Sequence, residues 1–234
     1  MKTQASTAPL ASTAAIARGH SQAVGGDALN VLRNTYRLLA MTLFFSAGVA
    51  ALTAALKLPH PGLLLTLGGY FGLLFLTSHL RNSAWGLVSV FALTGFMGYT
   101  LGPLLAAYLS LANGPAMIVT AMGATGAIFA GLSWYARQDN AIDMMRFGTF
   151  LTVGIITAFC LALAAYFFAM PALSAAVSGL FILLMSGLLL YQTQAIINGG
   201  ERNYIMATVT LFVALFNLFT SLLHLLGIFG GDEA

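Results

Sequence analysis

The chain has 234 residues, of which 59% are hydrophobic and only 6% are charged, and its mean hydropathy is +0.92. A soluble domain carries roughly 25% charged residues, so this composition excludes a soluble domain and indicates a polytopic membrane protein. The net charge of +3 comes from Lys and Arg residues scattered between apolar segments. This distribution is typical of membrane topology signals and excludes a nucleic-acid-binding patch.

The first residues form a region of their own. Residues 1–28 are rich in Ala, Ser, Thr, Gly and Gln, and they lack the apolar core that a signal peptide needs. Such a composition favours a flexible segment before the first membrane span. We therefore expect three regions: a flexible cytoplasmic tail at 1–28, a transmembrane domain at 29–230 and a short outer tail at 231–234.

Charged residues divide the remaining chain into apolar intervals, and a helix needs about 20 apolar residues to cross a bilayer. Three intervals are each long enough for two spans: Arg37–Arg81, Arg81–Arg137 and Arg146–Glu201. Pro or Gly interrupts each near its middle, which predicts three helical hairpins, and the C-terminal interval holds one more span. The sequence thus predicts an all-α membrane protein with seven helices, at about 35–56, 62–80, 84–110, 116–136, 147–169, 173–197 and 203–229.

The basic residues also predict an orientation, because Lys and Arg stay on the cytoplasmic side during membrane insertion. With the N-terminus inside, every Arg lies on the cytoplasmic side and only Lys57 of the two lysines lies outside. Since the number of spans is odd, the C-terminus is expected outside.

The predicted spans hold few side chains that could perform chemistry. Asp, Glu, Lys and Arg lie in loops, in tails or at span ends, and His224 is the one histidine well inside a span. The histidines have no metal-ligand spacing, and the single Cys160 is expected to be a small buried apolar residue. We therefore predict no catalytic residue, no cofactor and no metal site.

An intramembrane hydrolase is a remote alternative, with Ser133 in the segment GLSW (131–134) as nucleophile and His224 as its base. Ser133 is predicted one helical turn from the cytoplasmic end of its span, and His224 about two turns from the outer end of the last span. Most of the membrane thickness would then separate them. We interpret Ser133 as a helix-packing residue and His224 as an amphipathic residue near the interface.

The third predicted span carries small residues on one helix face. Gly95, Gly98 and Gly102 are spaced so that another helix backbone can approach closely. Pro103 lacks the amide hydrogen that would bond back to Tyr99, so a kink is expected there. We interpret this segment as tight packing around a bend, with a gate as the alternative. Looser patterns of small residues occur in the second and fourth spans, at Gly68, Gly69 and Gly72 and at Gly123, Gly126 and Ala130.

Several segments are similar to those of one known family. They are TGFMGYTLGPLL (94–105), LLYQTQAIINGG (189–200) and LFVALFNLFTSLLHLLG (211–227). Together with the seven spans, they resemble the Bax inhibitor-1 family across residues 30–229. Three further segments resemble the bacterial YccA-like branch of that family: VLRNTY (31–36), LPHPGLLLTLGG (58–69) and GGERNYIMATVTL (199–211).

The resemblance implies a bundle with the last helix near its centre and the other six around it. In the calcium-leak branch, two aspartates on the sixth and seventh helices form a pH-sensitive latch, and the corresponding positions here are Gln192 and Ala214. Neither residue ionises near neutral pH, so a latch that shares a proton cannot form. Gln192 and Gln194 are instead expected to form hydrogen bonds between helices, with Asn217 as a candidate partner.

Members of the YccA-like branch modulate FtsH, a membrane-anchored AAA protease. The resemblance therefore implies a non-enzymatic regulator of a bacterial inner membrane that binds FtsH, together with HflK and HflC. We expect it to act as a slowly processed substrate that the protease grips by the N-terminal tail. The alternative is a pH-regulated calcium or proton leak channel, which the replacement of both aspartates disfavours.

Overall fold

The computed structural model describes residues 8–138 and 144–230, with side chains for residues 27–138 and 145–230. Within these ranges the chain forms seven α-helices and no β-strand. They are α1 (Ala8–Ala55), α2 (Leu63–Leu80), α3 (Trp85–Leu109), α4 (Gly114–Tyr135), α5 (Met144–Phe167), α6 (Pro171–Ile197) and α7 (Tyr204–Gly230). All seven are long and apolar enough to cross a membrane, which confirms the predicted all-α membrane fold.

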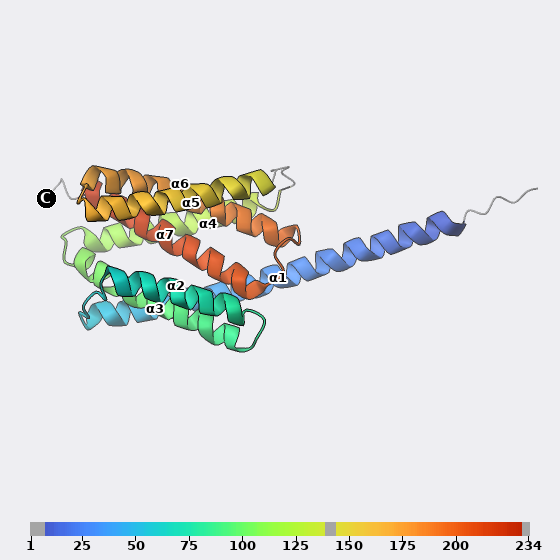
Figure 1. The fold of residues 1–234 in the computed structure, drawn as a ribbon, viewed down its shortest axis with the longest axis horizontal. Coiled ribbons are helices and arrows are strands. Elements are labelled where there is room, and N and C mark those ends of the chain that lie inside the picture. Colours follow the sequence, from blue (N-terminus) through green and yellow to red (C-terminus); the bar gives the residue numbers. More distant parts are fainter. Residues whose placement is uncertain (1–7, 139–143, 231–234) are drawn as a thin grey trace, which may run out of the picture.

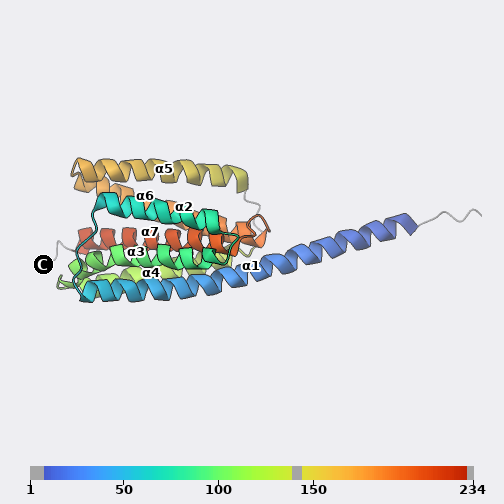
Figure 2. The same cartoon turned by 60° about the horizontal axis from the view of Figure 1, so that its bottom comes forward.

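The first helix departs most from the predicted elements. α1 has 48 residues, and it continues from the candidate span Asp27–Ala55 back to Ala8. Residues 8–26 are therefore helical and not irregular, because their many alanines favour a helix. Figures 1 and 2 show this part of α1 projecting beyond the ends of the other helices. The flexibility of the tail stays a prediction, and the predicted outer tail lies outside the described residues.

α7 lies at the centre of the bundle, as the family resemblance implies. It packs against α1, α3, α4 and α6, and both views place it among these neighbours (Figures 1 and 2). α2 packs mainly against α3, and α5 packs mainly against α6. α7 therefore has four helices as close neighbours, and α2 and α5 lie outside these four. This differs from the six helices around α7 that the resemblance implies.

The burial pattern explains this arrangement. α7 is apolar on nearly every face, as a helix surrounded by others must be. Its first half supplies many of the most buried residues of the core, among them Ala207, Leu211, Phe212 and Ala214.

The two outer helices instead expose large apolar side chains, such as Phe75 of α2 and Phe150 of α5. Lipid tails are as apolar as leucine, so such side chains can face a bilayer without loss. For the same reason the prediction that Cys160 is buried is wrong: this residue of α5 is exposed.

Asn203 ties the start of the central helix to the loop between α2 and α3. Its side-chain oxygen accepts hydrogen bonds from the backbone amides of Ile205 at 3.0 Å and Met206 at 3.1 Å, which caps α7. Its side-chain nitrogen donates to the backbone oxygen of Arg81 at 3.1 Å and to Oδ1 of Asn82 at 3.0 Å. One side chain therefore both starts α7 and positions it against the α2–α3 hairpin.

Candidate functional site

The positions that correspond to the family's aspartate pair lie in the interior of the bundle. Gln192 of α6 is 7% exposed, its neighbour Gln194 is 3% exposed, and Ala214 of α7 is fully buried. α6 and α7 pack extensively against each other. The latch positions are therefore inside the protein, but they carry an amide and a methyl group.

The glutamines do not make the expected hydrogen bonds between helices. Among the described residues, Gln192 Nε2, Gln194 Oε1 and Thr35 Oγ1 of α1 are buried without a partner. Asn217, the candidate partner, donates instead from Nδ2 to the backbone oxygen of Val213 at 2.8 Å within α7. An unpaired buried polar group costs about 1–3 kcal/mol. The two amides thus do not stabilise the α6–α7 contact in the way predicted.

No carboxylate replaces the missing aspartates in the described part of the chain. Its acidic residues are Asp27, the first residue of the candidate span in α1, and Glu201, which accepts a hydrogen bond from the backbone amide of Asn203 at 2.8 Å. α6 and α7 contain neither Asp nor Glu, so these two helices cannot share a proton between carboxylates. Nor do any three described His, Cys, Asp or Glu residues form a group that could hold a metal ion.

Two glycines allow α3 to lie very close to α1. A Cβ built on Gly98 would lie 2.9 Å from Oγ of Ser46 and nearer still to its backbone oxygen. A Cβ built on Gly102 would lie 2.7 Å from Cβ of Thr53 and 3.0 Å from the backbone oxygen of Ala50. Real Cβ atoms essentially never approach within 3.0 Å, so glycine is required at this contact, which we term the α1–α3 seam.

The other two residues singled out in this segment flank the seam. A Cβ on Gly95 would lie 2.8 Å from ring carbon Cε1 of Phe45, so Gly95 also faces α1. Pro103 lies inside α3 and offers no amide hydrogen to the carbonyl group of Tyr99. The structure thus places all three glycines against α1, while the kink and the gate stay predictions.

Ser133 and His224, considered above as nucleophile and base, have different partners. The hydroxyl group of Tyr36 in α1 donates to Ser133 Oγ in α4 at 3.2 Å. His224 Nδ1 in α7 lies 2.8 Å from Ser178 Oγ in α6. Both residues therefore join helices, and they do not form a pair with each other.

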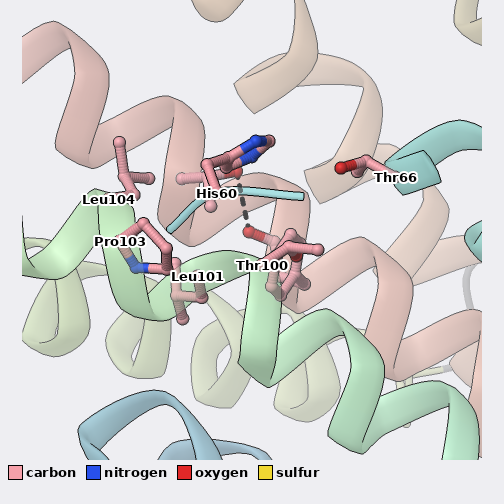
Figure 3. A pocket seen from close by; sticks show the side chains of 8 residues that line it. His60, Thr66, Thr100, Leu101, Pro103 and Leu104 are labelled. Atoms are coloured by element: carbon pink, nitrogen blue, oxygen red, sulfur yellow. Dashed lines mark hydrogen bonds between the residues drawn. The ribbon is translucent and has the colours of Figure 1, made fainter. Parts of the chain in front are cut away.

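A hollow of about 390 Å³ lies beside the C-terminal half of α7. It is bordered by His60 of the α1–α2 loop, by Thr66 of α2 and by α3 around Pro103, with Phe216 and Thr220 of α7 on the other side. Figure 3 shows Thr100, Leu101, Pro103 and Leu104 of α3 facing this space.

A smaller hollow, of about 230 Å³, lies on the other side of Thr220, which borders both. It is lined by residues of α5, α6 and α7, and most of these carry a hydroxyl or amide group. Sequence reasoning missed this site. Its one signal was the recurrence of polar residues on one helix face, at Ser174 and Ser178 in α6 and at Asn217, Thr220, Ser221 and His224 in α7.

The seven apolar helices of the described residues, with the last at their centre and no acid in the final two, define a polytopic α-helical membrane protein with an uncharged core. The family model described as "Inhibitor of apoptosis-promoting Bax1" matches residues 28–231. The chain belongs to this family, the Bax inhibitor-1 family.

Individual relatives are similar to this chain over most of its length. An uncharacterized protein of Pseudomonas aeruginosa is 52% identical over 203 residues, which are 87% of this chain and 91% of that protein. The "Modulator of FtsH protease YccA" of Escherichia coli is 48% identical over 202 residues, 86% of this chain and 91% of its own. The same identity holds for the "Inner membrane protein YccA" of another E. coli strain.

These relatives confirm the resemblance to the YccA-like branch and the inner-membrane location of this multi-pass protein. The family and the name of the E. coli relative favour a regulatory membrane protein over an enzyme. The expectations that the chain has no enzymatic activity, cofactor or metal stay predictions.

Proposed function

We propose that this protein binds the FtsH protease in the inner membrane and modulates its activity. The observation that carries the proposal is the 48% identity to a protein named for that role, extending over 91% of its length. Because the similarity covers the whole bundle, a partner surface on any helix can be common to both proteins. HflK and HflC are proposed as companions in the complex from the family resemblance.

The proposed mechanism is slow extraction, in which FtsH grips the N-terminal tail and the bundle resists the pull. The helical part of the tail supports this idea, because it extends about 30 Å before Ala28, the first buried residue of α1 among those whose side chains are described. A protease that pulls on this end must then separate α1 from α3. The α1–α3 seam opposes that step, since side chains of α1 sit directly on the glycines of α3.

A leak channel is less well supported. The middle of α7 is filled by Leu211, Phe212 and Leu218, which are essentially inaccessible. α6 and α7 offer no anionic oxygen, which a calcium ion prefers as a ligand.

The test uses FtsH and this protein reconstituted together in proteoliposomes, with a second membrane substrate whose cleavage rate is measured. Two variants are compared with the full chain: one lacks residues 1–26, and the other carries an unrelated unstructured sequence of equal length in their place. The full chain is expected to slow cleavage of the second substrate, the deletion to lose that effect and the replacement to keep it. Undiminished inhibition by the deletion would overturn the tail mechanism. Cleavage unchanged by the full chain would overturn the proposed function.

A further inference from the structure

The smaller hollow beside α7 is polar although it lies within the membrane-spanning bundle. Of the residues that line it, Ser174, Ser178, Asn217, Thr220 and Ser221 carry hydroxyl or amide groups. Ser178 and Ser221 are only 9% and 8% exposed, so these hydroxyl groups belong to the interior and not to a solvated surface. Lipid tails cannot supply hydrogen-bond partners, so such groups call for a polar neighbour.

Several hydrogen-bond donors of the hollow are already used within their own helices. The hydroxyl groups of Ser178 and Thr220 donate to backbone oxygens at 3.0 Å, and Asn217 Nδ2 donates to a backbone oxygen at 2.8 Å. Since a serine hydroxyl has one hydrogen, we assign the 2.8 Å contact between Ser178 and His224 to donation by His224 Nδ1–H. The groups left for a ligand at these positions are acceptors, above all Oδ1 of Asn217.

Ser221 supplies a hydrogen-bond donor that complements the acceptor of Asn217. Its hydroxyl makes no hydrogen bond with any other described residue, and it lines the hollow. It is therefore free to donate, while Asn217 Oδ1 is free to accept. A lipid head group that carries a hydroxyl, alone or beside an ester, can both donate and accept hydrogen bonds. It therefore matches the donor of Ser221 and the acceptor of Asn217.

The charge of the lining residues and their depth in the membrane further restrict which ligands the hollow can bind. No Asp, Glu, Lys or Arg lines the hollow, so a phosphate or ammonium group would be buried there without a counter-charge. The lining residues of α7 lie about 10–20 Å from its C-terminal end, below the level of phospholipid phosphates. The volume of about 230 Å³ falls below the roughly 300 Å³ of the smallest drug-sized sites, so it suits a head group and not a whole lipid.

The contact between α2 and α5 supplies a route from the bilayer. These helices meet at the ring pair of Phe71 and Phe159, whose centroids are 5.9 Å apart, and Phe71 is largely exposed. Phe159 lies one helical turn from Ala162, which lines the smaller hollow. Because α2 packs mainly against α3 and α5 mainly against α6, few contacts join α2 to α5 at this point.

We propose that the smaller hollow binds the head group of an uncharged, hydroxyl-bearing lipid such as a diacylglycerol. Ser221 donates to the glycerol oxygens, the lipid hydroxyl donates to Oδ1 of Asn217, and the acyl chains leave between α2 and α5.

The test measures equilibrium binding of radiolabelled dioctanoylglycerol to the purified full chain in detergent micelles. Saturable binding is expected. Ser221→Ala is expected to weaken it about five- to tenfold, which corresponds to about 1–1.4 kcal/mol for one hydrogen bond. Ser133→Ala is the matched control, because Ser133 is equally buried at 8% exposure but lies in α4 away from the hollow, and it should bind like the parent. Thermal unfolding of both variants checks that each is folded.

Two further ligands test the chemistry of the head group. Dioctanoyl phosphatidylglycerol adds a charge, and the methyl ether of dioctanoylglycerol removes the hydroxyl; both are expected to bind at least fivefold more weakly. Affinity equal to that of dioctanoylglycerol for either compound would overturn the proposal. So would a lack of saturable binding by the full chain, or an equal loss in Ser221→Ala and Ser133→Ala.

Discussion

α3 and α4 both carry glycines at helix-face spacing, and the structure uses them in opposite ways. On Gly98 or Gly102 of α3, a Cβ would collide with α1. On Gly123 or Gly126 of α4, a Cβ would meet nothing within 4 Å. Glycine spacing alone therefore does not distinguish a helix seam from an open face.

The glycines of α3 and α4 therefore differ in their effect on the free energy of folding. A glycine inside a helix is less stable than alanine by roughly 0.5–1 kcal/mol, because the unfolded glycine backbone has more freedom to lose. In α3 this deficit is offset by the close approach of α1. In α4 no contact of the described structure offsets it, so the two helices should respond to the same substitution with opposite signs.

The largest effect is expected from Gly102→Leu. The added side chain would meet Thr53 and the backbone of Ala50, so overpacking should lower the free energy of unfolding by about 3 kcal/mol. Unfolding in mixed micelles of mild detergent and SDS would measure it. Gly126→Leu in α4 is the matched control, and since its Cβ meets no atom it should leave stability unchanged or raise it by up to about 1 kcal/mol. Equal losses in both variants would break the distinction between seam and open face.

A smaller change at the seam links stability to the proposed function. Gly98→Ala adds one methyl group against the backbone oxygen of Ser46, and a loss of about 1–2 kcal/mol is expected. If the seam resists extraction of α1, FtsH should also degrade this variant faster than the parent in proteoliposomes. A lower stability with an unchanged degradation rate would separate the seam from the extraction step.

Gly148 is expected to give a destabilisation of intermediate size, because its neighbour is a side chain that can move. A Cβ on Gly148 of α5 would lie 2.9 Å from the ring of Tyr191 in α6. Gly148→Ala should therefore cost about 1 kcal/mol, and almost nothing in a Tyr191→Leu background. The double-mutant cycle on unfolding free energies measures this coupling. Full additivity would show that the ring does not limit the contact.

The smallest expected effect is an increase in the free energy of unfolding. Gly123→Ala and Gly126→Ala are each expected to stabilise the protein by about 0.5–1 kcal/mol, since the methyl group meets no atom and the unfolded chain loses freedom. Denaturation of the two single variants and their combination would show it. A destabilisation would contradict the open face that the structure gives this side of α4.

Much of the fold could be predicted because membrane spans are set by length and apolarity. Six helices begin and end within a few residues of the predicted positions. The start of α1 at Ala8 could not be predicted in the same way, because its alanine-rich helix lies outside the apolar interval. The central place of α7 came from family resemblance, and the outer positions of α2 and α5 needed the structure.

The candidate site was only partly predictable, since burial follows from position but partners follow from packing. Gln192 and Gln194 are buried as a polar core residue would be, yet the neighbour that each amide faces depends on helix rotation and depth. His224 could be placed within a span but not beside Ser178, because the two lie on different helices. The polar hollow has the same origin: its lining is assembled from three helices, none of which is unusual alone.

The continuity of α1 has a mechanical consequence. From Ala8 to Ala55 it is one helix, about 72 Å of hydrogen-bonded backbone, so tension applied at its free end reaches the far side of the bundle without a slack linker. Its weakest turn holds Gly25 and Gly26, just before the membrane-spanning part begins at Asp27. Under load the helix would uncoil there first, and only tension beyond what this turn can bear without uncoiling would be limited before it reached the membrane-spanning part.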